Sequence, residues 1–255
     1  MARRRRFRGL IIAALVLVLA GGALIAAEAV LRGVVQDRVR GIVADALDLP
    51  ETQRIDVAVG GIVIPQLIAG RLDDVAIDAP DLAVAGLTGD ASVRLHGVPA
   101  RGDDTSALGG DARIGLDAGD VETLLAAASG SWGELVDVEI ALPGPEAVLS
   151  GGFSVFGQTV PLELDAVPSL DGGDVVVTPE AFRVGGLELT ADDLAQAPVD
   201  LSGISAPVTV CRGDALPAGI SVASVGIRAE HLAVELRLDD GFVDDPAAPL
   251  EGGCA

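Results

Sequence analysis

Histidine and cysteine, two residue types that often carry out chemistry, are rare in this chain. His96 and His231 are its only two histidines, and neither has Cys or acidic neighbours at the spacing of zinc ligands. The acidic pairs, of which Asp73-Asp74 is typical, lack the loop spacing that calcium requires. We therefore expect no metal site and no cofactor.

Serine chemistry is also weakly indicated. Ser131 lies in the sequence Ser-Gly-Ser-Trp-Gly, which does not fit the Gly-x-Ser-x-Gly elbow of a serine hydrolase. The chain lacks a P-loop and a dinucleotide-binding fingerprint as well. We expect no enzyme, and a hydrolase that uses Ser131, His96 or His231 is the weakest of the hypotheses considered.

Two cysteines, Cys211 and Cys254, are the remaining reactive groups. In an exported chain, two Cys favour a disulfide over a catalytic thiol. This bond would close a loop of about 43 residues, stabilise the fold by roughly 4 kcal/mol and attach the C-terminal tail to the body. A lipidated Cys is excluded, because neither residue follows the signal region.

The N-terminal segment predicts export. Residues 1–8 are basic, and Leu10–Ala27 is an uncharged run about 27 Å long as a helix, marginally enough to cross a bilayer. Ala27-Glu28-Ala29 has the form of a signal-peptide cleavage site, whereas the length of the run favours an uncleaved transmembrane helix. We expect a cell-envelope protein, at the outer face of the cytoplasmic membrane or secreted to the periplasm-like space.

The chain is strongly acidic, with 17 Lys and Arg against 38 Asp and Glu and a net charge of −21. Such a surface repels phosphate backbones, so nucleic acid is not expected as a partner. The charge also disfavours electrostatic attachment to anionic lipid headgroups. Any membrane contact must therefore be hydrophobic or tethered.

An amphipathic helix is predicted over Ala29–Leu47, where apolar residues recur at helical spacing and Pro50 follows. The next organising stretch is Ile62–Val84. It begins as a strand, breaks at Pro65, forms a short apolar knuckle and turns at Gly70. It then alternates strictly between apolar and acidic or small residues, which predicts a half-buried strand.

Most of the remaining chain predicts strands, with one short helix over Ala118–Ala128 capped by Asp117 or Asp120. The predicted fold is α+β, in which a curled antiparallel β-sheet wraps the long N-terminal helix, a tubular lipid-binding-like arrangement. We divide the chain into a signal or anchor segment (1–29), one α+β domain (30–243) and an acidic tail (244–255). The predicted strands are Ile55–Val59, Asp90–Gly97, Val136–Leu142, Ala147–Phe156, Thr159–Leu164, Asp174–Val177, Phe182–Thr190 and two runs within Ile220–Leu238.

One helix cannot cover the whole apolar face of such a sheet, and the remaining groove could hold an acyl chain or be filled by side chains. Aromatic residues on loops or strands could form an apolar lip at this groove, although ordinary packing is the simpler interpretation. The candidate lipid-contact residues are Val34, Val39, Ile42, Pro65, Leu67, Ile68, Arg71, Trp132, Phe153 and Phe156.

Two segments resemble a known family. Residues 65–75, Pro-Gln-Leu-Ile-Ala-Gly-Arg-Leu-Asp-Asp-Val, and residues 211–220, Cys-Arg-Gly-Asp-Ala-Leu-Pro-Ala-Gly-Ile, resemble the actinobacterial LmeA-like phospholipid-binding family, typified by a lipomannan elongation factor. The resemblance covers most of the chain from about residue 30 onward. It implies an envelope protein that binds phospholipid and supports lipoglycan (mannan) elongation, and it supplies no catalytic residues. The motif positions are Pro65, Leu67, Gly70 and Arg71.

The role of Arg71 has two interpretations. It could pair with Asp73 or Asp74 and fix the turn, which we favour, or it could hold a lipid phosphate. The leading hypothesis is an exported protein that binds phospholipid in an apolar groove between helix and sheet and contacts the membrane through its N-terminal helix. The alternative is a structural scaffold for envelope glycosyltransferases that binds no lipid.

Overall fold

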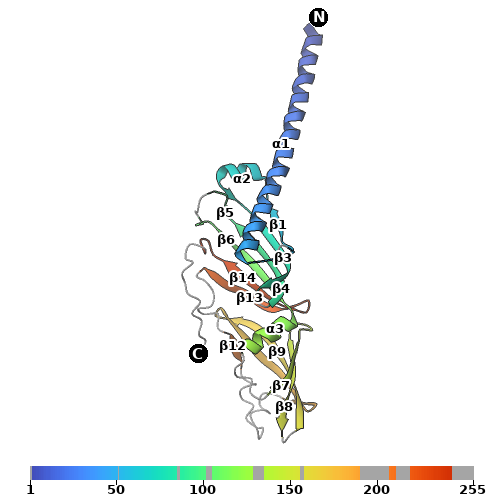
Figure 1. Ribbon diagram of the computed structural model, residues 1–255, viewed down its shortest axis with the longest axis vertical. Helices are drawn as coiled ribbons and strands as arrows, with labels where there is room; N and C mark the ends of the chain where they lie inside the picture. Colours follow the sequence, from blue (N-terminus) through green and yellow to red (C-terminus); the bar gives the residue numbers. More distant parts are fainter. Residues whose placement is uncertain are drawn as a thin grey trace.

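The computed structural model describes residues 2–50, 52–84, 87–101, 105–128, 135–155, 158–189, 207–210 and 219–242 (Figure 1). The helices are α1 (Ala2–Ala46), α2 (Val63–Ala69) and α3 (Ala118–Ala128). The strands are β1 (Asp56–Val59), β2 (Arg71–Leu72), β3 (Val75–Val84), β4 (Leu87–His96), β5 (Val98–Pro99), β6 (Gly109–Leu116), β7 (Leu135–Ala141), β8 (Ala147–Val155), β9 (Gln158–Asp171), β10 (Asp174–Val184), β11 (Leu187–Leu189), β12 (Val208–Val210), β13 (Ile220–Arg228) and β14 (His231–Leu238).

Helix α1 is one continuous element of 45 residues. It joins the apolar run and the predicted amphipathic helix, and its N-terminal part extends beyond the rest of the molecule (Figure 1). Among the described residues, no helix is long and apolar enough to cross a membrane, and the transmembrane helix predicted over Leu10–Ala27 is therefore not confirmed. Most side chains of that run lie outside the described part of the chain.

The strands form antiparallel sheets. The first sheet has the order β1-β3-β4-β6-β14-β13, and the second has the order β11-β10-β9-β8-β7, with β12 also paired to β10. Strands β2 and β5 form a separate two-stranded sheet. In Figure 1 the first sheet lies next to α1 and the second lies beyond it, away from the N-terminus. The chain passes to the second sheet through α3 and returns to the first as the hairpin β13–β14.

The main core lies between α1 and one edge of the first sheet. It contains fully buried residues such as Val63 and Val75, which are 0% and 1% exposed. Val35, Val39 and Val43 of α1 pack against this cluster. A second, smaller core forms around Leu164 and Phe182 in the second sheet.

The predicted α+β class, with a long N-terminal helix and antiparallel strands, is confirmed. A curled or closed sheet is not found among the described residues, because the strands divide into separate sheets joined through α3. The knuckle after Pro65 is a short helix, α2, since proline is tolerated in the first turn of a helix. Residues 192–205 and the tail 244–255 lie outside the described residues.

Candidate functional site

Apolar side chains form rows across the first sheet. Residues directly opposite each other in antiparallel strands point to the same face. Val93 packs against the core under α1, so its row defines the face that we call the inner face. The row through Val93 is Ile77, Val93, Ala112, Leu236 and Val222, and the neighbouring row is Ala79, Ala91, Ile114, Val234 and Val225.

The two rows are covered unevenly. Ile77 and Ala79, on β3, are 8% and 5% exposed, whereas the members of both rows from β4 to β13 are only half-buried. Helix α1 packs on β1 at the sheet edge. A helix about 10 Å across cannot cover six strands that are each about 4.8 Å apart. The side chains of both rows from β4 to β13 therefore remain only half-buried.

The three predicted lipid-contact residues of α1 do not share one environment. Val39 packs against the core of the first sheet. Val34 and Ile42 are 59% and 56% exposed and lie off the stripe formed by Val35, Val39 and Val43. Of the three residues, Val39 therefore belongs to the packing of the core, whereas Val34 and Ile42 lie on the surface of α1.

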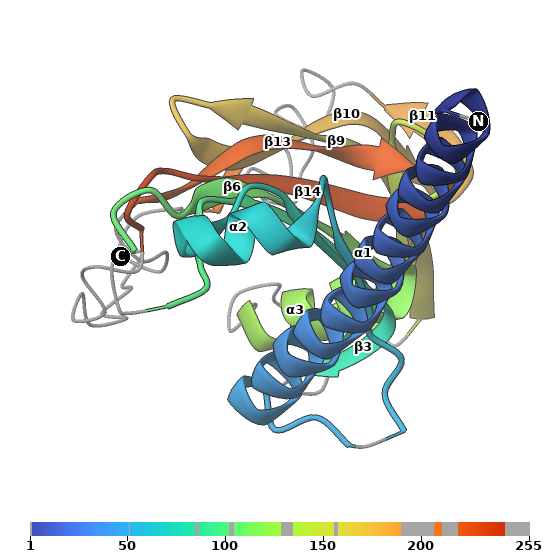
Figure 2. The ribbon, with the colours of Figure 1, turned by 90° about the horizontal axis from the view of Figure 1, so that it is seen from above.

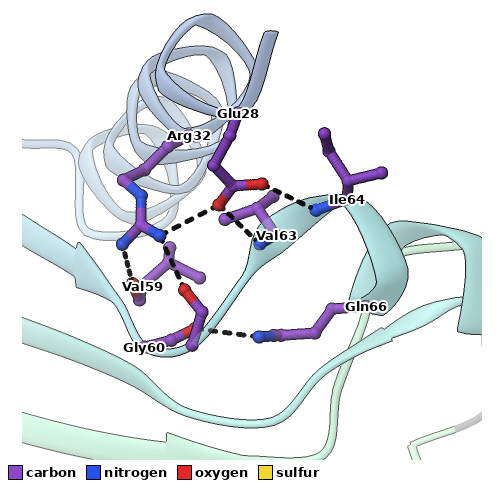
Figure 3. Close-up of polar contacts among 8 residues, drawn as sticks. Glu28, Arg32, Val59, Gly60, Val63, Ile64 and Gln66 are labelled. Carbon is purple, nitrogen blue, oxygen red and sulfur yellow. Dashed lines mark hydrogen bonds and ion pairs between the residues drawn. The ribbon is translucent and has the colours of Figure 1, made fainter. Parts of the chain in front are cut away.

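Helix α1 is fastened to α2 by Glu28 (Figure 3). The amides of Val63 and Ile64 donate to its two carboxylate oxygens over 2.7 and 3.1 Å. These amides belong to the first turn of α2, whose own N-cap residue, Ile62, provides no side-chain cap. Glu28 thus caps a helix from a distant part of the chain. The hydrogen bond from Val63 is the main reason that the pKa of Glu28 lies below its ordinary value.

Arg32 completes this junction one turn along α1. Its guanidinium donates to the carbonyls of Val59 and Gly61 over 2.7 and 2.6 Å and pairs with Glu28 over 2.9 Å (Figure 3). The pair therefore ties α1 to both the end of β1 and the start of α2. Glu28 and Arg32 were not among the predicted site residues, and their four-residue spacing on a helix is the one sequence signal that could have indicated the pair.

The family-like motif forms α2 and the turn that follows. Leu67 packs against the core, and Ile68 is 74% exposed. Gly70 ends the helix with a left-handed φ of 86°, and its amide donates to the carbonyl of Gln66. Gln66 is 7% exposed, and its side chain donates to the carbonyl of Gly60 and accepts from the amide of Asp73. The buried side-chain amide of Gln66 therefore links the loop before α2 to the turn that follows β2.

Arg71 follows on β2 and is exposed. Within the described residues it has no ion pair, so the pairing with Asp73 or Asp74 that we favoured is not observed there. Pro65 lies in the first turn of α2. The motif residues are thus brought together around α2, at the end of the first sheet where α1 extends away from the body (Figure 1).

The other predicted positions are not gathered at this place. Phe153 lies on β8 of the second sheet, opposite Val160, and its side chain lies outside the described part. Trp132, Phe156 and both members of the predicted disulfide, Cys211 and Cys254, lie outside the described residues.

The opposite, outer face of the first sheet is polar. Glu235 accepts from Arg113 at 2.7 Å, from Ser224 at 2.8 Å and from Arg228 at 3.2 Å. The hydroxyl of Ser224, followed by Arg113, holds the pKa of Glu235 below its ordinary value. An open cleft of about 570 Å³ lies beside this network, with Gly115, Ala233 and charged residues along it. No group of residues that could hold a metal ion occurs in the described part of the chain.

The fold is an α+β arrangement whose first sheet has a half-buried apolar inner face. The chain matches the family model described as LmeA-like phospholipid-binding over residues 26–237, and it therefore belongs to this family, as the motif predicted. Membership implies phospholipid binding, and the family is one of lipid-binding proteins, not of enzymes. Neither a curated protein nor a solved structure matched the chain.

Proposed function

We propose that this protein binds a phospholipid by placing its acyl chains on the inner face of the first sheet, between β4 and β13. The observation that carries this proposal is the pair of apolar rows that are buried at β3 but only half-buried beyond it. The rows offer Val, Ile, Leu and Ala without a charged side chain. Family membership supports phospholipid as the ligand class.

Acyl-chain burial supplies enough affinity for such a site. Each methylene removed from water contributes about 0.8 kcal/mol, so covering ten methylenes offsets the several kcal/mol that association costs. The acidic surface of the domain disfavours attraction of anionic headgroups at a distance. The affinity for the phospholipid held on the inner face therefore depends mainly on the apolar contact with its acyl chains, and this affinity should vary little with ionic strength.

The proposed place of action is the cell envelope, outside the cytoplasmic membrane. The basic residues 1–8 and the uncharged run after them support export of the domain. There the protein would deliver or hold phospholipid for envelope lipid and lipoglycan (mannan) assembly. This role agrees with a lipid-binding family and needs no catalytic residue on this chain.

Native mass spectrometry of the full chain, purified with export, tests the proposed function. We expect a defined added mass in the phospholipid range, or uptake of one after incubation with phospholipid vesicles. A protein that stays bare in both conditions would contradict lipid binding. It would then favour a scaffold for envelope glycosyltransferases with a fully packed interior.

A further inference from the structure

Four large apolar side chains are exposed where α1 and α2 meet. Leu24 and Ile25 of α1 are 63% and 73% exposed, and Ile62 and Ile68, at the two ends of α2, are 64% and 74% exposed. We call these four residues the apolar cap. Helices α1 and α2 contact each other, and Figure 2 shows α2 beside α1 above the first sheet. These four side chains therefore expose apolar surface to water on two helices that are in contact.

The apolar cap is held in a fixed arrangement. Glu28 lies one helical turn after Leu24, and it binds the first two amides of α2. Arg32 binds the loop between β1 and α2 through two carbonyls. This junction therefore fixes the direction in which α1 leaves the body relative to Ile62 and Ile68.

The surroundings of the apolar cap differ from the rest of this acidic chain. Residues 62–70 carry no charge, and α1 continues from Leu24 toward the N-terminus through an uncharged run. Arg71 and Arg101 are both exposed. The pairing of β2 with β5 places Arg71 opposite Pro99, which lies two residues before Arg101, so both Arg lie next to α2. These two Arg offset Asp73 and Asp74, which follow β2.

We propose that the apolar cap is the surface that contacts a phospholipid bilayer, with Ile62 and Ile68 inserted among the headgroups and Arg71 and Arg101 near their phosphates. This inference rests on the proposed function, since a phospholipid ligand must be taken from, or given to, a bilayer. The inference adds to the proposed function the surface of the protein at which phospholipid is exchanged with the bilayer. The uncharged continuation of α1 and the uncharged α2 fit the interfacial layer of a membrane, and the local Arg pair fits its phosphates.

Fluorescence of a single introduced tryptophan tests this surface. The chain has one Trp, so Trp132→Phe provides a background for Ile68→Trp in the full chain. The matched control is Leu187→Trp in the same background, because Leu187 is 70% exposed but lies on β11 of the second sheet. With vesicles of brominated phosphatidylcholine and phosphatidylglycerol, we expect at least twofold quenching and a blue shift at position 68, and neither at position 187.

Equal quenching at the two positions, or none at position 68, would overturn the inference. A concentration-dependent blue shift at position 68 without vesicles would overturn it too, because it would assign the apolar cap to contact between two copies of the chain. Adding Arg71→Gln and Arg101→Gln should reduce quenching by phosphatidylglycerol vesicles several-fold.

Native mass spectrometry of the same variants separates this inference from the proposed function. Bound phospholipid without quenching at position 68 contradicts only the membrane-contact surface. Quenching at position 68 in a protein that never carries phospholipid contradicts only the proposed lipid site.

Discussion

At the scale of single residues, Glu28 joins α1 to α2. Its two carboxylate oxygens satisfy the first amides of α2, and it also pairs with Arg32. Sequence alone does not indicate this role, because Val63 lies 35 positions away and the same residue fits a signal-peptide cleavage pattern. The contact depends on the tertiary structure, because it forms only when α1 lies over the end of β1.

Glu28→Gln should lower the melting temperature at neutral pH, because a neutral amide accepts weakly and cannot reproduce both hydrogen bonds to α2. The folded-state pKa of Glu28 is lowered, so its contribution to stability is present above the ordinary Glu pKa of about 4.3 and is lost as the pH falls through the folded value. The wild type should therefore lose more stability than the variant between neutral and acid pH.

Thermal unfolding at several pH values measures this difference. Asp37→Asn is the control, because Asp37 pairs with Arg40 on the surface of the same helix and is 75% exposed. Its melting temperature should change little at any pH. Parallel pH profiles for Glu28→Gln and the wild type would show that the contact with α2 does not stabilise the fold.

At the scale of elements, local patterns predicted most of the architecture. The alternation from Val75 predicted β3, and the predicted hairpin within Ile220–Leu238 is present. Helix α3 has its predicted bounds. Asp117 is its N-cap, because its side chain accepts a hydrogen bond from the amide of Asp120 at 2.9 Å. Helix α2 was missed because Pro65 was interpreted as a break. The division into separate sheets was missed because strand pairing between distant segments leaves no local signal.

Two valines on α1 test whether the helix packs as described. Val39→Ala should destabilise the protein by about 1–2 kcal/mol, because it removes packed methyl groups from the core of the first sheet. Val34→Ala, the same change at a side chain that is 59% exposed, should stay within about 0.5 kcal/mol of the wild type. Chemical denaturation of both variants gives the comparison. Equal losses would contradict the orientation of α1.

At the scale of the whole molecule, the apolar cap, which we propose contacts the membrane, and the inner face of the first sheet lie on neighbouring elements. Figures 1 and 2 show α1 and α2 at the end of the first sheet where α1 leaves the body. The apolar cap belongs to these two helices, and the inner face is the side of the sheet that packs against α1. The sequence could predict a lipid-binding protein from its motif and its one-sided strands. It could not predict which strands α1 leaves half-covered, because that depends on where the helix crosses the sheet.

The most direct test of the lipid site is a matched pair of substitutions on opposite faces of the first sheet. Ala112, on β6, belongs to the inner face, whereas Ala233, on the neighbouring strand β14, lies along the cleft of the outer face, and both are half-buried. Phospholipid bound per protein after vesicle incubation is measured for Ala112→Phe and Ala233→Phe, with melting temperatures confirming that both fold. We expect Ala112→Phe to reduce bound phospholipid at least fivefold, because its ring occupies space for an acyl chain, and Ala233→Phe to retain it. Equal lipid in the two folded variants would contradict binding on the inner face.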